Sequence, residues 1–318
     1  MTDKSSNAWA ANYRSWLDYV ADVVRTYESG KDIPIGPSPE PLALPADSAP
    51  PAKGFKVVIC APHPDDETLS GALPLRWRLE AGAQVTDCAI TLGSDHGQRE
   101  RRRRELASAC RVLGFEMAIL PTAQGATGLD DVNPASHRQH PKAWAEKVNT
   151  LAEFFDQAQP DVVQAPHAED FNTTHLGTRE LVVEALGMHL EHRGGGASLP
   201  LIESESWHQL AAPNLMLALT PEVVALQLMA AAEHGGEMVR NPYHLRHCPR
   251  LMHNVQRGSE VVLGQGGPAL PYVFAELYRV TFMRGREFLE PRPGGCIVAP
   301  REHFGLEELM TQFGPQGN

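Results

Sequence analysis

Residues 55–67 read FKVVICAPHPDDE, and this stretch decides the fold. It begins with an apolar run of the length of a buried strand and ends in a turn of histidine, proline and acidic residues from His63 to Glu67. A helix is predicted from about Thr68 to Glu80. The turn lacks the GxGxxG pattern that binds the pyrophosphate of a dinucleotide, which argues against a nucleotide-binding Rossmann function.

Short apolar runs and helical patterns alternate along the chain beyond this point. Strands are predicted at 83–93, 117–121, 161–166, 199–206, 214–220 and 275–282, and further helices at about 99–113, 143–158 and 174–192. This alternation is typical of a parallel sheet covered by helices. The predicted fold is therefore a Rossmann-like α/β fold, with a mainly parallel sheet and helices on both faces.

The segment before the first strand has a different pattern. Apolar residues from Trp9 to Tyr27 recur with a helical period and predict an N-terminal amphipathic helix that ends near Gly30. Residues 31–54 contain seven prolines and predict an extended linker. The apolar stripe of the helix must pack either on the main domain or on another subunit. We expect three parts: the helix and Pro-rich linker (1–54), the main domain (55–290) and a C-terminal tail (291–318).

The charge balance excludes some classes of partner. The chain has 28 Lys and Arg against 39 Asp and Glu, a formal net charge of −11, which argues against a general binder of nucleic acid. The basic run from Arg99 to Arg104 is interrupted by Glu100 and is interpreted as a solvated helix face.

Cysteine usage and the chain's hydropathy indicate the compartment. Five scattered cysteines without a CxxC pair predict free thiols in a reducing environment. No stretch approaches about 18 apolar residues, and the first residues lack the apolar core of a signal peptide. We therefore expect a cytoplasmic protein without a membrane span.

The turn after the first strand concentrates groups that bind a cation. An imidazole and two carboxylates lie within four residues, at His63, Asp65 and Asp66, where an open α/β sheet places its site. Zinc accepts histidine nitrogen and carboxylate oxygen, and a catalytic zinc keeps one position open for water. A third ligand must come from another loop at the same sheet edge, and the loop from His167 to His175 follows the strand at 161–166.

The heptapeptide APHPDDE at 61–67 resembles the signature of the LmbE-like, or PIG-L, family of zinc N-deacetylases. Weaker matches are Thr91-Leu92-Gly93, Arg102 followed by Glu105, the loop that ends in His175, and Ala275-Glu276-Leu277. The resemblance covers about Phe55 to Phe282 and implies a deacetylase domain over 55–290. Family members remove acetyl groups from N-acetylglucosamine units of glycolipids, thiol cofactors, oligosaccharides and antibiotics.

The resemblance also implies a role for each residue of the motif. His63, Asp66 and His175 match the positions of the three zinc ligands, and Asp65 matches that of the general base. Zinc lowers the pKa of bound water, and a nearby carboxylate can accept its proton and later protonate the departing amine. The expected metal is zinc. Iron and cobalt tolerate the same ligands, so the identity of the metal is left open.

The second loop departs from the family pattern. Relatives usually have HPDH there, and this chain has Asn172-Thr173-Thr174-His175. Asn172 is predicted to donate a hydrogen bond to the oxyanion, although an amide supplies no positive charge. His167, His234 and His244 are candidates for that charge and for contact with substrate. Relatives also often have His-Ser-Gln where this chain has His234-Gly235-Gly236, which puts the usual substrate in doubt.

Four further segments allow two interpretations each. Arg102 either holds substrate or pairs with neighbours of Glu105 on its helix. Glu67 either supports the metal ligands or complements a helix dipole, and Asp170 either positions His175 or forms an Asx turn. The segment 243–248, flanked by Pro242 and Pro249, is predicted to be an irregular loop rather than a second metal site.

The sequence thus predicts a zinc-dependent hydrolase with one Zn²⁺ per chain that removes an N-acetyl group from an acetamido sugar or sugar-like amide. One alternative is a zinc amidase that cuts a larger acyl group or a thiol conjugate. Another is an inactive relative that binds metal or sugar. The resemblance also implies a homo-oligomer.

Overall fold

A computed structural model describes residues 4–38, 40, 42–43, 54–122, 125, 127–194, 196, 198–264, 266, 268 and 270–315, with side chains from residue 11 onward. Its strands are β1 (Lys56–Ala61), β2 (Gln84–Ala89), β3 (Glu116–Ile119), β4 (Val162–Pro166), β5 (Leu199–Ser204), β6 (Leu215–Leu219), β7 (Phe274–Arg284), β8 (Glu287–Leu289) and β9 (Cys296–Val298). Its α-helices are α1 (Lys4–Gly30), α2 (Asp66–Leu69), α3 (Ala72–Glu80), α4 (Arg99–Leu113), α5 (Pro134–Gln139), α6 (Pro141–Ala158), α7 (Thr173–His192), α8 (Pro221–Glu233), α9 (Gly235–Arg240), α10 (Tyr243–Val261) and α11 (Leu306–Phe313), and a 3₁₀-helix covers His96–Gln98.

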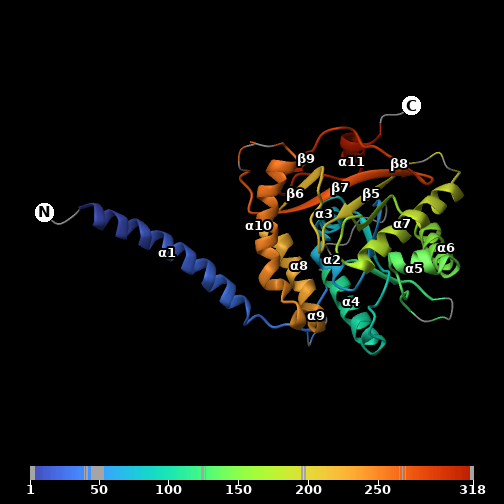
Figure 1. Ribbon diagram of the computed structural model, residues 1–318, viewed down its shortest axis with the longest axis horizontal. Helices are drawn as coiled ribbons and strands as arrows, with labels where there is room; N and C mark the ends of the chain where they lie inside the picture. The colour runs from blue at the N-terminus through green and yellow to red at the C-terminus, as the bar shows by residue number, and fades with distance from the viewer. Residues whose placement is uncertain are drawn as a thin grey trace.

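The strands form one mixed sheet in the order β3-β2-β1-β4-β5-β7-β6-β9, and β8 pairs with β7. Strands β3, β2, β1, β4 and β5 are parallel neighbours, β7 is antiparallel to β5 and β6, and β9 is parallel to β6. The predicted fold class is confirmed, with a mostly parallel sheet at the centre of an α/β domain (Figure 1).

Successive residues of β1 enter two different layers of the core. Val57 and Ile59 belong to a buried cluster that includes side chains of α3, α4 and α8. Val58 and Cys60 belong to a second cluster with side chains of α6 and α7. Because side chains alternate across a strand, the apolar run of β1 fills both layers, and every residue of the strand after Lys56 is buried. The predicted placement of helices on both faces is therefore confirmed.

The strand order places a switch point beside β1. The chain proceeds from β1 to β2 and β3 on one side, and from β4 to β5 on the other. The loops that leave β1 and β4 at their carboxyl ends therefore diverge from adjacent strands and leave a crevice between them. Open α/β sheets bind ligands at such a crevice.

The helix predicted at 68–80 is divided into α2 and α3. The break falls at Ser70 and Gly71, where an added Cβ on Gly71 would lie 2.0 Å from the carbonyl oxygen of Glu67. Only glycine permits this close approach, so the backbone can leave α2 and restart as α3 within two residues. The helix also begins earlier than predicted, at Asp66.

Helix α1 extends away from the rest of the chain (Figure 1). The large apolar side chains that it presents are exposed, among them Trp16, Tyr19 and Val23. The alternative in which this stripe packs on the main domain is therefore wrong for the described side chains. The side chain of Trp9 and part of the proline-rich linker lie outside the described residues.

The C-terminal residues pack on the sheet. Strand β9 pairs with β6, and Leu309 and Phe313 of α11 are buried in the same cluster as Val57. The division of the chain at 54 and 290 stays a prediction, but residues after 290 contribute to the core of the domain.

Two further features concern the chain as a whole. Among the helices that the structure describes, none combines the length and the apolar character needed to cross a membrane. The five cysteines are free, and Cys60, Cys88 and Cys110 are buried, as their apolar surroundings predict.

Tyr278 of β7 holds the α2–α3 connection against the sheet. It is fully buried, and its hydroxyl accepts a hydrogen bond from the backbone N–H of Leu73 at 2.9 Å. The hydroxyl also lies within hydrogen-bond distance of the carboxylate of Glu276 and of the carbonyl oxygen of Ser70. Replacing Tyr278 by Phe would therefore leave several buried polar groups unpaired.

We expect Tyr278→Phe to lower the free energy of unfolding by about 1–3 kcal/mol, because a buried group without its partner keeps its desolvation cost. Urea denaturation measures this change. The control is Tyr272→Phe, since Tyr272 is half-buried and its hydroxyl makes no hydrogen bond within the described residues. Equal stability of the two variants would contradict the anchoring role of Tyr278.

Candidate metal centre

The loop after β1 is closed by its own side chains. Asp66 is the first residue of α2, and its Oδ2 atom accepts the backbone N–H of His63 at 3.0 Å. The carboxylate therefore folds back over the turn and faces the histidine three residues before it. This bond lies within one turn, so it positions two of the predicted ligands without help from residues elsewhere in the chain.

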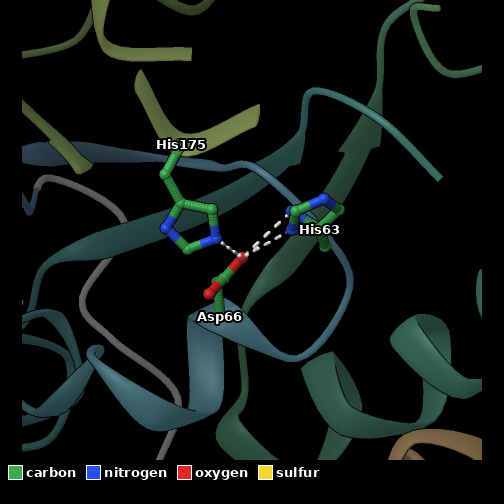
Figure 2. Close-up of side chains that lie close together, drawn as sticks. All are labelled: His63, Asp66 and His175. Atoms are coloured by element: carbon green, nitrogen blue, oxygen red, sulfur yellow. Dashed lines mark hydrogen bonds and ion pairs between the residues drawn. The ribbon is translucent and has the colours of Figure 1, made fainter. Parts of the chain in front are cut away.

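The loop after β4 brings the third predicted ligand to the same place. Oδ2 of Asp66 lies 3.5 Å from Nδ1 of His63 and 3.4 Å from Nε2 of His175. One potential ligand atom from each of the three residues lies within 4.8 Å of the other two, and Figure 2 shows both rings directed toward the carboxylate. The structure thus brings together the three residues predicted to bind metal.

His175 lies in the first turn of α7 and is fully buried. Burial alone would lower the pKa of this imidazole, but the carboxylates of Asp66 and Asp170 outweigh it and raise the pKa to about 10. Asp170 acts through its Oδ2 atom, 3.5 Å from Nδ1 of His175. The site therefore favours a positive charge between the ring and the carboxylate.

The donor set fits a divalent metal ion. Neither ring nitrogen of His175 has a hydrogen-bond partner within the described residues, although the ring is buried. Two imidazoles and one carboxylate are a ligand set of catalytic zinc sites. The carboxylate of Asp170 lies beside His175, in the position of a group that orients a ligand histidine. Its Oδ1 atom also accepts the backbone N–H of Asn172, as in an Asx turn. Asp170 can therefore fill both predicted roles.

Asp65 occupies a strained position between the two ligands of the first loop. Its φ of 121° lies in the left-handed half of the map, which is unusual for a residue other than glycine. Its side chain is buried and lines the cavity in front of the metal ligands. Burial, and then the charge of Asp66, raise the pKa of this carboxyl well above its ordinary value. A carboxyl with a raised pKa suits proton exchange near neutral pH.

Glu67 and His234 hold this strained turn through hydrogen bonds. One oxygen of Glu67 accepts the backbone N–H of Asp65 at 2.8 Å, and the other lies 2.6 Å from Nε2 of His234. Both side chains are almost completely buried. His234, predicted to contact substrate, does not line the cavity. Glu67 fixes the backbone of the catalytic turn, which favours the supporting role over a helix-dipole role.

Arg102 reaches the cavity from α4. Its Nη2 atom donates to the carbonyl oxygen of Pro64 at 3.1 Å, and Gly93 makes room for the guanidinium. At Gly93, whose φ is +85°, an added Cβ would lie 2.3 Å from Nη1 of Arg102. The ion pair with Glu105 is made instead by Arg101, at 2.6 Å. Arg102 lines the cavity, where its Nε atom lies 3.9 Å from Oε1 of Glu237, and its contact with substrate stays a prediction.

Asn172 is the N-cap of α7 and lines the cavity. Its Oδ1 atom accepts the backbone N–H of Thr174 at 2.8 Å. The amide NH₂ group makes no hydrogen bond within the described residues, so it is available as a donor. The side chain is therefore oriented by its role as a helix cap, and its free group is of the kind that an oxyanion requires.

The other two histidine candidates lie outside the cavity. His167 is buried, and its Nε2 atom lies 2.9 Å from the carbonyl oxygen of His208. Together with Glu169 and His208 it forms a second group whose ligand atoms lie within 4.8 Å of one another. His244 is half-buried on α10, and neither of its ring nitrogens has a hydrogen-bond partner within the described residues. The structure does not place either ring against the predicted ligands.

The segment 243–248, predicted to be an irregular loop, is the start of helix α10, and that prediction was wrong. Pro242 is the N-cap, where no intrahelical N–H is needed. Pro249 lies inside the helix and removes one backbone hydrogen bond, a loss that the packing of α10 on β6 and β7 offsets.

A cavity of about 490 Å³ opens in front of the metal ligands. Besides the predicted residues, its wall includes side chains of α10 that the sequence analysis did not identify: Tyr243, Arg246, His247 and Arg250. Their spacing of three, four and seven residues is helical, and that signal was available in the sequence. The two prolines concealed it.

A comparison with family models gives one match. Residues 58–186 match the PIG-L family, described as GlcNAc-PI de-N-acetylase. This part of the chain is therefore similar to a PIG-L family domain. The matched range runs from β1 to α7 and includes both loops of the metal centre, so the resemblance noted in the sequence is confirmed. The family description supports the interpretation that the chain is an enzyme of the deacetylase class. No curated protein matches the chain in sequence.

Several solved structures are similar to this chain in fold. A conserved protein of Thermus thermophilus has a TM-score of 0.51 and 18% identity over 71% of this chain and 94% of that one. The 4-carboxy-2-hydroxymuconate hydratase GalB of Pseudomonas putida has a TM-score of 0.51 and 17% identity over 71% and 95%. The N,N′-diacetylchitobiose deacetylase of Pyrococcus horikoshii has a TM-score of 0.51 and 16% identity over 73% and 85%. At this identity the likeness concerns the fold, and the reaction must be argued from the site.

The pair of Glu67 and His234 gives the folded chain a pH-dependent contribution to stability. Burial alone would lower the pKa of His234, but the charge of Glu67 and its hydrogen bond raise it above 6.5. The folded state therefore binds the proton more tightly than the unfolded state. This contribution is fully present below the unfolded pKa and is lost as the pH rises through the folded pKa.

We expect His234→Gln to cost more stability at about pH 6 than at about pH 9, since only the protonated ring forms the ion pair. Urea denaturation of both proteins at several pH values measures the difference. The control is His253→Gln on α10, whose exposed ring has no partner in the described part of the chain. A cost for His234→Gln that is independent of pH would contradict the ion pair.

Proposed function

We propose that this chain is a zinc-dependent hydrolase that removes the acetyl group from the amide nitrogen of an acetamido sugar or a sugar-like amide. One observation carries the proposal: His63, Asp66 and His175 converge on one point, and two of them, His63 and Asp66, line a cavity that Asp65 also lines. The PIG-L match covers all four residues. The family description, which names a de-N-acetylase, supports the type of reaction.

His63, Asp66 and His175 would hold the metal ion, and Asp170 would orient His175. When bound there, zinc supplies a Lewis acid that makes water more acidic and polarises the amide carbonyl. Iron or cobalt would fit the same donors, so zinc is proposed on the donor set and the family.

Asp65 moves the proton. Its carboxylate accepts a proton from the attacking water as the new C–O bond forms at the amide carbon. The same proton then passes to the amide nitrogen as the C–N bond breaks, so that acetate and the free amine leave and Asp65 returns to its starting state. The raised pKa of the Asp65 carboxyl makes it a stronger base and lets it carry the proton between the two steps.

Asn172 is proposed to stabilise the oxyanion. Its free amide NH₂ group at the cavity wall would donate a hydrogen bond to the oxygen on which negative charge develops. The amide brings no charge of its own, and Arg102 is the predicted substrate contact that brings a positive charge to the cavity wall. His167, His234 and His244 are not assigned to this step, because they do not line the cavity.

The cavity volume of about 490 Å³ is in the range of small-molecule sites and suits a substrate of sugar size. A larger acyl group or a thiol conjugate is the alternative substrate, and comparing the release of acetate with that of longer acids separates the two. The homo-oligomer and the cytoplasmic location stay predictions, and the exposed face of α1 is the surface through which we expect self-association.

We expect removal of the metal to abolish hydrolysis and Zn²⁺ to restore it. A ligand at about 100 times its dissociation constant stabilises a fold by about 2.7 kcal/mol, so Zn²⁺ should raise the melting temperature of the metal-free protein. His175→Ala should lose both the bound metal, measured by elemental analysis, and the thermal shift. His253→Ala is the matched control. Full metal content in His175→Ala would exclude this centre.

We expect Asp65→Asn to lower kcat by about 10²–10⁴-fold and to retain the metal, because a general base contributes a factor of this size. Asparagine tolerates a positive φ and keeps the strained backbone. Acetate release from N-acetyl sugars and metal content are measured on the same samples. Asp32→Asn, at an exposed carboxylate, is the control. Unchanged turnover would remove Asp65 from the mechanism, and failure of the metal-loaded wild type on every amide would favour the inactive relative.

A further inference from the structure

One wall of the cavity is a polar face of α10. Tyr243, Arg246, His247 and Arg250 line the cavity and are spaced as neighbours on one side of a helix. Val255 of the same helix packs in a cluster with Met216 and Leu277 of β6 and β7. The sheet thus fixes the direction in which this polar face points.

The acidic residues of the cavity are already engaged. Glu237 accepts a hydrogen bond from Arg240 at 2.5 Å and lies 3.9 Å from Nε of Arg102. Asp65 and Asp66 belong to the catalytic turn. Arg246 and Arg250 form no ion pair with a carboxylate within 4.0 Å in the described residues. Arg250 interacts at longer range with the buried Glu276, and its charge opposes the rise that burial causes in the pKa of that carboxyl.

Arg250 is held close to the metal centre. Its Nη2 atom donates to the carbonyl oxygen of Leu69 at 2.5 Å, and Leu69 ends the short helix α2 that begins at Asp66. The Nε atom of Arg250 is buried and has no hydrogen-bond partner within the described residues. A guanidinium with a buried free donor at a cavity wall is ready to bind an acceptor group.

His247 adds a buried donor to the same face. The ring is 4% exposed, and its Nε2 atom has no hydrogen-bond partner in the described part of the chain. Burial, and then the charge of Arg250, lower the pKa of His247 to about 3, so the ring is neutral near pH 7. A neutral imidazole carries one N–H group, which can donate to an anion without a further charge.

We propose that Arg246, His247 and Arg250 form an anion subsite that binds a carboxylate or phosphate group of the substrate, while its acetamido group lies at the metal centre. The inference rests on the proposed function and specifies the substrate class as an anionic N-acetyl compound. The planar fork of arginine matches both oxyanions, and two guanidinium groups that form no ion pair in the described residues favour an anion over a neutral hydroxyl.

The test uses metal-loaded protein with Asp65→Asn, so that substrates bind without turnover. Calorimetry compares N-acetylglucosamine with two anionic probes, N-acetylglucosamine 6-phosphate and N-acetylmuramic acid, which distinguish phosphate from carboxylate. Each titration is repeated with Arg246→Gln and with Arg250→Gln. Arg14→Gln is the charge-matched control, because Arg14 is exposed on α1. Inorganic phosphate is titrated at the same zinc content as a probe without an amide.

We expect at least one anionic probe to bind about tenfold or more tightly than N-acetylglucosamine, and each Arg→Gln change to remove most of that gain. Arg14→Gln should leave it unchanged. Arg246 makes no contact that the fold needs, so its variant keeps the test valid if Arg250→Gln unfolds. Equal affinity of the protein for neutral and anionic probes would overturn the subsite. So would an Arg→Gln change that weakens the binding of neutral and anionic probes by the same factor.

The two proposals fail separately. If wild-type protein hydrolyses no amide but phosphate binding still falls about tenfold in the arginine variants, the anion subsite stands and the deacetylase proposal fails. If neutral N-acetyl sugars are hydrolysed and the arginine variants bind phosphate as well as Arg14→Gln does, the subsite fails and the deacetylase proposal stands.

Discussion

The rest of the site depends on the contacts that the Asp66 carboxylate makes with His63 and His175. The carboxylate accepts the backbone N–H of His63 within its own turn and faces His175 from the loop after β4. A single oxygen, Oδ2 of Asp66, thus joins a local turn to a distant helix. This arrangement requires β1 and β4 to be neighbours and to run parallel, because only then do both loops leave at the same edge of the sheet.

The catalytic turn is held in a conformation that it would not choose alone. Asp65 adopts a positive φ, and its backbone N–H is bound by the buried carboxylate of Glu67, which is in turn paired with His234. A strained residue persists when its surroundings over-determine it, and here they direct a carboxyl group into the cavity. The motif therefore needs Glu67 as much as the residues that face the metal.

Much of the fold and the floor of the site followed from the sequence. Alternating apolar runs and helical patterns are local signals, and they identified the parallel strands and both layers of helices. The turn at 63–67 carries its candidate ligands within five residues, so the convergence of His63, Asp66 and His175 could be predicted as well. The break at Gly71 was missed, because it arises from a close approach to the backbone of Glu67 that no periodicity reveals.

The positions of two candidate histidines also depend on tertiary packing. His234 and His244 were plausible substrate contacts by residue type, but in the folded chain His234 pairs with Glu67 and His244 lies beside Gly30. The α10 wall was hidden by Pro242 and Pro249.

The separation of His63 and His175 along the chain has a consequence for how the protein assembles. An ion gripped by both side chains closes the long intervening loop, which contains β2, β3 and β4, and acts as a reversible cross-link between distant parts of the chain. Such a link favours compact states over extended ones, because it binds only where both histidines meet. The supply of metal would then influence how much of the newly made polypeptide reaches its native form, quite apart from what the finished enzyme catalyses.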